Sequence, residues 1–138
     1  MVTIRPAQLQ DIALCERMAH DPILRFPSGG YPDSGFLKDH LNSNYFLVAE
    51  ADGKVVGWIL GEALKAHGSA LWFFIVDEPY RKQGVGTKLY EEFEKVLKKD
   101  GREWVFLTSH INNTAAKEFY LKNGFVQGEP HFEMAKNL

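Results

Sequence analysis

The stretch Phe73–Lys88 reads FFIVDEPYRKQGVGTK, and it sets the fold class of this 138-residue chain. It overlaps the wholly apolar run Ala70–Val76, which predicts a buried central strand. A short basic loop follows, and Gly84-Val85-Gly86 then opens the longest helical pattern of the chain. A buried strand, a glycine turn and a long helix in this order are typical of an α/β protein.

The glycine turn predicts an anion-binding site. The first N–H groups of a helix have no partner inside the helix, and the aligned peptide dipoles place about half a positive charge there. Glycine lets an anion approach the backbone, and Arg81 and Lys82 add full charges. The same glycines also suit a tight turn that binds nothing. Neither GxGxxG, where Leu89 replaces the third glycine, nor GxxxxGK[ST] is present.

Apolar spacing and turn residues predict the remaining elements. Helices are expected at residues 7–20, 35–41, 84–100 and 113–122. Strands are expected at residues 2–5, 45–50, 54–64, 70–76, 104–109, 125–127 and 131–136. The order β-α-α-β-β-β-α-β-α-β-β predicts an α/β chain with a mixed sheet, in a single domain that covers residues 1–138.

Composition excludes several other classes of protein. An apolar fraction of 45% with ten Phe and three Trp predicts a packed core. Sixteen basic and eighteen acidic residues give a net charge of −2, which disfavours a nucleic-acid binder. Cys15 is the only cysteine, so neither a disulfide within the chain nor a thiolate zinc site is expected. No apolar run approaches the ~20 residues of a membrane span, and no leader pattern is evident, so we expect a cytoplasmic protein that does not associate with membranes.

Two segments resemble one known family. The run Arg81-Lys82-Gln83-Gly84-Val85-Gly86 is similar to the [RQ]-x-x-G-x-[GA] acyl-CoA motif of the GNAT superfamily of N-acetyltransferases. A later segment resembles that family's second block, with Ser109 in place of the usual Val. The matching residues there are Leu107, Asn113, Ala116, Phe119, Tyr120, Gly124 and Phe125. Both blocks stand in the family's order, and the resemblance covers nearly the whole chain.

The resemblance implies acetyl-CoA as co-substrate, and no metal. The acyl-CoA would lie in a wedge where the strand that ends at Val76 splays from the strand at 104–109. Main-chain amides near the end of that strand would pair with the pantetheine arm and polarise the thioester carbonyl. The implied cofactor-binding residues are Phe74, Ile75, Val76, Arg81, Lys82, Gln83, Gly84, Val85, Gly86, Thr87, Asn113, Ala116, Phe119 and Tyr120. Asn113 is equally suited to cap the helix that follows it.

The resemblance also implies that Tyr120 donates a proton to the leaving thiolate. Asn113 and Tyr120 are seven residues apart, so they lie on one face of a helix. A phenol of pKa ~10 protonates a thiolate of pKa ~8.5 at an expense of roughly 2 kcal/mol. The alternative is a tyrosine that simply packs in the core beside Phe119.

The general base is less clear from the sequence. Some family members carry a Glu near the start of the central strand, but residues 69–72 here are Ser-Ala-Leu-Trp. Glu62 on the neighbouring strand is the first candidate, followed by His110 and His67, and a chain of water molecules is another route. Deprotonation at pH 7 costs about 4.6 kcal/mol for a lysine-like amine and about 1.4 kcal/mol for an α-amine. The absence of a carboxylate at residues 69–72 therefore suits an acceptor amine that is only weakly basic.

By the same resemblance, residues 21–42 would overlie the acceptor side of the site. Phe26, Tyr31 and Phe36 are suited to line a small pocket there, or only to pack the loop onto the core. Arg25 is suited to pair with a substrate carboxylate. The expected reaction acetylates a primary amine, either a small molecule or an amino acid derivative. The alternatives are a protein N-terminal acetyltransferase acting on a peptide N-terminus and an acyl-CoA-binding regulatory module without turnover; a homodimer is one assembly to test.

Overall fold

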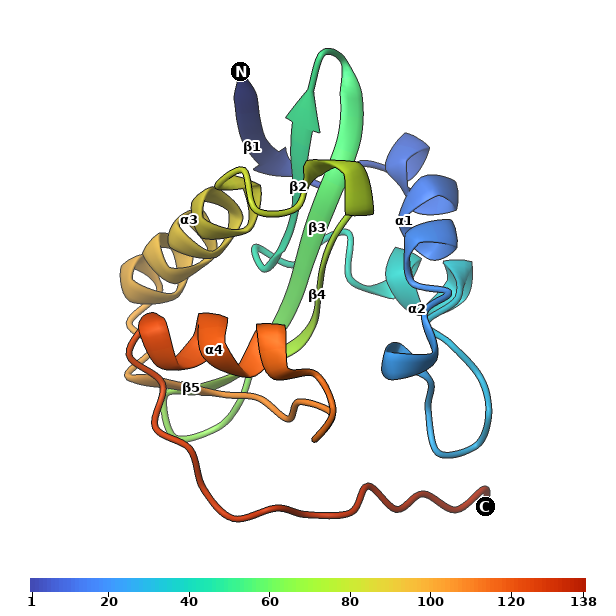
Figure 1. Cartoon of the computed structure of the whole chain (residues 1–138), viewed down its shortest axis with the longest axis vertical. Coiled ribbons are helices and arrows are strands. Elements are labelled where there is room, and N and C mark those ends of the chain that lie inside the picture. Colours follow the sequence, from blue (N-terminus) through green and yellow to red (C-terminus); the bar gives the residue numbers. More distant parts are fainter.

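A five-stranded mixed sheet with helices on both faces forms the body of the chain in a computed structural model that describes all residues 1–138 (Figure 1). The first four strands are antiparallel neighbours, and the last is parallel to the fourth, which confirms the predicted mixed sheet. Across the sheet the strands are β1 (Val2–Pro6), β2 (Phe46–Ala51), β3 (Lys54–Ala63), β4 (Gly68–Val76) and β5 (Trp104–Phe106). The helices are α1 (Ile12–Met18), α2 (Ser34–Asp39), α3 (Val85–Lys99) and α4 (Thr114–Lys122), with 3₁₀ turns η1 (Leu9–Asp11), η2 (Pro22–Leu24) and η3 (Glu78–Tyr80).

The sheet separates two hydrophobic cores. Helices α1 and α2 cover one face, where Phe46 and Trp58 are buried together with the fully buried Cys15. Helices α3 and α4 cover the other face, where Leu89 and Phe93 of α3 pack against β2, β3 and β4 (Figure 1). Each face of the sheet is therefore closed by one pair of helices.

Helix α3 follows the predicted pattern closely. It begins after Gly84, whose φ of 84° is in the left-handed region that glycine adopts without strain. Its apolar stripe of Val85, Leu89, Phe93 and Leu97 is buried against the sheet. At 15 residues, α3 exceeds the other helices in length, and none of the helices is long and apolar enough to cross a bilayer.

Four of the elements predicted from the sequence differ from the structure. The strands predicted at 125–127 and 131–136 do not form, since no backbone group of residues 126–138 is hydrogen-bonded and β5 remains the last strand of the sheet. The strand predicted at 104–109 ends at Phe106, where its pairing with β4 ends. The helix predicted at 7–20 begins only at Ile12, because its first turn is the 3₁₀ turn η1.

The backbone of Gly61 in β3 gives a test of this packing. A Cβ atom at this position would lie 2.5 Å from Cζ of Phe93 and 2.6 Å from the carbonyl oxygen of Ala70. We therefore expect Gly61→Ala to lower the free energy of unfolding by about 1–3 kcal/mol in urea denaturation. Gly128→Ala is the control, since nothing lies within 4 Å of its added Cβ. An equal, negligible effect of both substitutions would contradict the described contact.

Candidate active site

The two central strands separate after three paired residues. Residues Gly68–Ala70 of β4 pair with Trp104–Phe106 of β5, and no pairing follows. In the same region, a register shift between Leu60 and Gly61 of β3 leaves Trp72 of β4 as an extra residue. A bulge of this kind bends its strand, so β4 turns away from β5 beyond this point. The predicted separation of the two strands is confirmed.

Beyond Trp72, β4 remains paired with β3 along its other edge. The N–H of Asp77 donates to the carbonyl oxygen of Val56 at 2.8 Å, and Ile75 is opposite Trp58. Since alternate residues of an antiparallel pair exchange hydrogen bonds, the polar backbone of Ile75 is directed at β3. The N–H of Ile75 is therefore not among the groups that face the gap.

Phe74 and Val76 face the gap instead. The carbonyl oxygen of Val76 accepts a hydrogen bond at 2.8 Å from Nε of Arg81, which comes from the loop beyond the strand and not from β3. By the same alternation, the N–H and C=O of Phe74 also point away from β3. The gap thus presents the N–H groups of Phe74 and Val76 and the carbonyl of Phe74 to any extended ligand with amide groups of its own.

At the open end of this gap lies a run of free amide donors. The N–H groups of Lys82–Thr87 donate to no acceptor in the chain, whereas the N–H of Arg81 bonds the Glu78 carbonyl at 3.2 Å. Lys82 has a φ of 60° and Gly84 a φ of 84°, a backbone alternation that turns successive N–H groups toward a common point. Such a concave group of donors at a helix N-terminus binds anions.

The charges around these donors are also unpaired. Arg81 and Lys82 are exposed, and neither forms a salt bridge. The side chain of Gln83 donates to the Pro79 carbonyl at 2.8 Å and so holds the loop together. The positive potential of the loop is therefore available to a diphosphate.

A pocket opens between β4 and the segment that follows β5, and residues of α4 and η2 complete its wall. It is lined by 12 residues, and its only titratable side chains are His110 and Tyr120. Of the predicted site residues, the pocket brings together Phe74, Asn113, Ala116 and Tyr120. The other lining residues are Ile23, Leu24, Leu71, Trp72, Phe73, Thr108, Ser109 and His110. Phe119 supports the pocket from behind, with its ring 5.4 Å from that of Phe74.

Tyr120 projects from α4 into this pocket with a free hydroxyl. Its ring packs 5.3 Å from Phe125 and 6.4 Å from Phe74, and its Oη forms no hydrogen bond within the chain. Burial raises the pKa of Tyr120 to about 12. The phenol therefore keeps its proton throughout the physiological pH range.

Asn113 has a structural role that the sequence left open. Its Oδ1 accepts the N–H of Ala116 at 3.1 Å, so it caps α4. The same side chain lines the pocket two turns before Tyr120. The cap fixes the start of α4 and thereby the direction in which Tyr120 points.

The three candidate bases occupy different places. Glu62 does not line the pocket; its carboxylate accepts the indole N–H of Trp72 at 3.1 Å, and Trp72 does line it. His110 lines the pocket, but its Nδ1 accepts the N–H of Asn112 at 3.1 Å, which places the proton of a neutral ring on Nε2. His67 is in the turn before β4, where its carbonyl bonds Glu103, and it does not line the pocket. No base therefore contacts the pocket with a free lone pair.

The loop over the acceptor side differs from expectation in the residues it supplies. Phe26 packs its edge on Phe73 at 5.8 Å, and Tyr31 stacks on His20 at 4.7 Å, so neither lines the pocket. Ile23 and Leu24 line it instead. They belong to η2, which Asp21 caps by accepting the N–H of Ile23 at 3.0 Å.

Arg25 is bound within its own loop. Its Nε donates to the carbonyl oxygen of Gly29 at 3.1 Å, and its guanidinium therefore braces the turn at Gly29. The Asp-Pro sequence at residues 21–22 starts the 3₁₀ turn that supplies Ile23 and Leu24. A proline after a capping aspartate is the local signal that could have located them.

Comparison with known proteins decides the family. The family model described as "Acetyltransferase (GNAT) family" matches residues 8–125. The chain belongs to the GNAT acetyltransferase family. The match includes the gap between β4 and β5, the free amides of Lys82–Thr87 and helix α4 with Tyr120.

Similar GNAT proteins come from several archaea. An N-alpha-acetyltransferase of Sulfurisphaera tokodaii is 29% identical in an alignment 140 positions long, gaps included, that covers 88% of this chain and 78% of that protein. The crystal structure of Ard1 from Thermoplasma volcanium is 29% identical and covers 93% of this chain and 84% of that one, with a TM-score of 0.83. A PaiA N-acetyltransferase of Thermoplasma acidophilum, solved with coenzyme A, shares the fold with a TM-score of 0.81 at 24% identity.

Some relatives are considerably longer than the region they share with this GNAT chain. An uncharacterised N-acetyltransferase of Methanocaldococcus jannaschii is 32% identical over 90 residues, or 61% of this chain and 40% of that relative. Two further relatives are covered to 26% and 53% of their lengths. The chain thus spans about a quarter to a half of these three proteins.

The free amides at the start of α3 predict that a negative charge there changes thermal stability and coenzyme A affinity in opposite directions. Thr87 is exposed in the first turn of α3. An aspartate there interacts favourably with the helix dipole, so Thr87→Asp should keep or raise the melting temperature. The same charge repels a diphosphate, and we expect at least a tenfold loss of coenzyme A affinity by calorimetry.

Thr87→Asn is the matched control, since it has nearly the same shape as aspartate without the charge. It should bind coenzyme A within about threefold of the unsubstituted chain. Unchanged affinity in Thr87→Asp would show that no phosphate lies near the N-terminus of α3.

Proposed function

We propose that the chain is an acetyl-CoA-dependent N-acetyltransferase whose acceptor is an α-amino group. The observation that carries this proposal is the run of free N–H groups at Lys82–Thr87, placed at the mouth of the gap between β4 and β5. Acetyl-CoA, when bound, supplies a thioester whose acetyl group passes to an amine with release of the thiol. The residues of the site fit such a molecule, since they offer diphosphate donors at one end and strand backbone along the gap.

Different residues of the chain bind different parts of acetyl-CoA. The amides of Lys82–Thr87, with Arg81 and Lys82, hold the diphosphate. The backbone groups of Phe74 and Val76 orient the extended pantetheine arm through amide hydrogen bonds. Phe74 and Phe119 keep water away from the inner part of the gap. Ile75 contributes through its side chain, which is buried on the α1–α2 face of β4, and not through its N–H.

Tyr120 is the proton source for the departing sulfur. With a pKa of about 12, it would lose roughly 4.8 kcal/mol in protonating a thiolate that kept a pKa of ~8.5. The thiolate, however, would be in the same poorly solvated pocket, and burial raises the pKa of a thiol as it raises that of a phenol. The difference between the two pKa values is therefore smaller than in water.

The identity of the acceptor follows from the missing base. No lining residue of the pocket is a carboxylate or a lysine, and Glu62 meets the pocket only through Trp72. An α-amine loses its proton to water at an expense about 3 kcal/mol smaller than a lysine side chain does. Relatives named N-alpha-acetyltransferase and Ard1, both 29% identical to this chain, favour a peptide N-terminus over the small molecule first expected.

The role of Tyr120 can be tested with Tyr120→Phe. We expect turnover to fall about 100-fold, because general acid catalysis is lost, while coenzyme A affinity stays within about threefold. In the unsubstituted enzyme, kcat/KM should rise as the amine deprotonates near pH 8. It should show no decrease up to pH 10, because the phenol is still protonated at that pH.

Tyr90→Phe is the control for this prediction. Tyr90 is a buried tyrosine on the same side of the sheet, but its hydroxyl lies 3.4 Å from Glu94 and outside the pocket, so turnover should be unaffected. If Tyr120→Phe turned over normally, another group or water would be the proton donor.

The acceptor can be tested by following thiol release with matched peptides. One peptide has a free N-terminus and no lysine, and the other is N-terminally acetylated and contains one lysine. We expect release only with the first. Release with small amines but neither peptide would favour a small-molecule enzyme, and tight coenzyme A binding without release for any amine would favour a regulatory acyl-CoA-binding module.

A further inference from the structure

Trp72 is the one residue of β4 in the pocket wall that no core holds in place. Four consecutive residues, Leu71 to Phe74, line the pocket from this strand. Leu71 and Phe73 are buried in the two cores, on opposite faces of the sheet. Phe74 packs its ring 5.4 Å from that of Phe119. Trp72 is 41% exposed, and as the extra residue of the bulge it has no partner on β3. The position of its side chain therefore depends on contacts outside the cores.

Two contacts from neighbouring strands hold the indole ring of Trp72. Its N–H donates to a carboxylate oxygen of Glu62 at 3.1 Å. Glu62 lies opposite Ala70 on β3, so it is a diagonal neighbour of Trp72, within reach of a long side chain. From β5, the ring of Phe106 meets the indole edge-on, with ring centroids 6.1 Å apart at an interplanar angle of 82°. Trp72 thus contacts both neighbours of β4 at the point where β4 and β5 separate.

The carboxylate of Glu62 has no other interaction in the chain. Glu62 is exposed and forms no salt bridge, and the indole N–H is the only donor to its carboxylate. A hydrogen bond to a charged acceptor is stronger than one between neutral groups. Since Glu62 does not line the pocket, what it supplies to the site is the orientation of Trp72.

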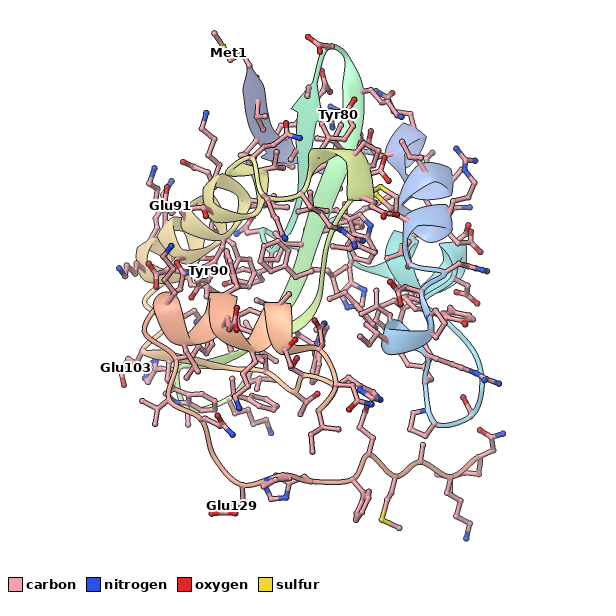
Figure 2. All side chains as sticks on the ribbon, viewed as in Figure 1. Met1, Tyr80, Tyr90, Glu91, Glu103 and Glu129 are labelled. Carbon is pink, nitrogen blue, oxygen red and sulfur yellow. The ribbon has the colours of Figure 1, made fainter.

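The wall of the pocket on α4 is held by packing. Tyr120 lines the pocket there, and the neighbouring Phe119 lies with its ring 6.0 Å from Tyr90 and 5.4 Å from Phe74. Figure 2 shows Tyr90 in the space between α3 and α4. The cavity that remains is about 70 Å³, far below the roughly 300–1,000 Å³ of common ligand pockets. Its width therefore depends on Trp72, the lining residue of β4 that is held outside the cores.

The residues assigned to acetyl-CoA lead to Trp72, and this step rests on the proposed function. The proposed function assigns the pantetheine arm to the backbone of Val76 and Phe74, and Trp72 is the next residue but one along the strand. Tyr120, the proposed proton donor to the sulfur, lines the same pocket as Trp72. The acyl group, which is attached to that sulfur, is therefore expected beside the indole.

We propose that Trp72 excludes acyl groups longer than acetyl from the pocket, and that Glu62 is the positioning residue that holds Trp72 in place. A longer chain would need the space that the indole occupies. One methylene too many against an apolar wall changes specificity by roughly 10- to 200-fold. The transfer itself is unaltered. The amine nitrogen bonds to the acyl carbon and the bond from that carbon to sulfur breaks, while water takes the amine proton and Tyr120 protonates the sulfur and regains a proton from water.

Trp72→Ala tests the limit on acyl length. By calorimetry, we expect the unsubstituted chain to bind butyryl-CoA about tenfold or more weakly than acetyl-CoA, and Trp72→Ala to bind both within about threefold. The kcat/KM values for the two donors should follow the same pattern. Equal binding of both donors by the unsubstituted chain would overturn the inference alone, whereas binding of neither would refute the proposed function as well.

Trp104→Ala is the matched control for this experiment. Trp104 is 48% exposed and also lies beside Phe106, at 6.5 Å, but it does not line the pocket. The variant should therefore keep the preference for acetyl-CoA. A preference lost equally in Trp104→Ala and Trp72→Ala would contradict a specific role of Trp72.

Glu62→Gln and Glu62→Ala separate a positioning residue from a base. The amide oxygen of glutamine still accepts the indole N–H but cannot take a proton from the amine. Glu62→Gln should therefore keep the preference for acetyl-CoA, and Glu62→Ala should lower the ratio of acetyl to butyryl turnover by about threefold or more. Loss of turnover to the same extent in both variants would identify Glu62 as the base and overturn its positioning role.

The indole N–H signals give a readout that needs neither donor nor acceptor. The chain has three tryptophans, and in nitrogen-15 NMR spectra Trp72→Ala identifies the signal of Trp72. Glu62→Ala should shift this signal, because the N–H loses its carboxylate partner, and Glu62→Gln should shift it less. The signals of Trp58 and Trp104 should stay in place. A Trp72 signal that is indifferent to Glu62→Ala would overturn the positioning role whatever the chain acetylates.

Discussion

The structure depends on an interrupted pairing between two strands. β4 and β5 pair over three residues, and the extra residue at Trp72 then bends β4 away from its neighbour. In a continuous sheet, the backbone of Phe74 and Val76 would be used for pairing with β5. The bulge leaves the N–H groups of both residues and the carbonyl of Phe74 without a β5 partner, and it opens the space into which α4 directs Tyr120. A ligand-binding gap thus arises from main-chain geometry, and the strand itself can remain apolar.

The apolar surroundings of the site also determine which proton transfers its residues can carry out. Tyr120 is half-buried among aromatic rings and has no hydrogen-bonding partner in the chain, so it holds its proton firmly. The pocket contains no carboxylate, and the nearby Glu62 is engaged by the indole of Trp72. A site built in this way can supply a proton but does not readily remove one. It therefore suits an acceptor that arrives with a modest affinity for protons, and α-amino groups have that property.

Local signals in the sequence predicted the parts of the molecule that depend on local interactions. The glycines of the α3 turn and the apolar stripe of that helix are set by neighbouring residues, and both were located correctly. The bulge at Trp72 and the entry of η2 into the pocket depend on contacts between distant segments. The strand predicted at 131–136 was wrong, because alternation of side chains does not by itself supply a paired neighbour, and no backbone group of this segment is hydrogen-bonded.

One buried side chain has a consequence for the product of the proposed reaction. Cys15 is inaccessible, and burial raises the pKa of its thiol to about 12, so the thiolate that attacks disulfides is practically absent. Free coenzyme A oxidises readily to symmetric and mixed disulfides. A folded chain with no reactive sulfur can release this thiol repeatedly without becoming covalently trapped by it, even when the cellular redox balance turns oxidising.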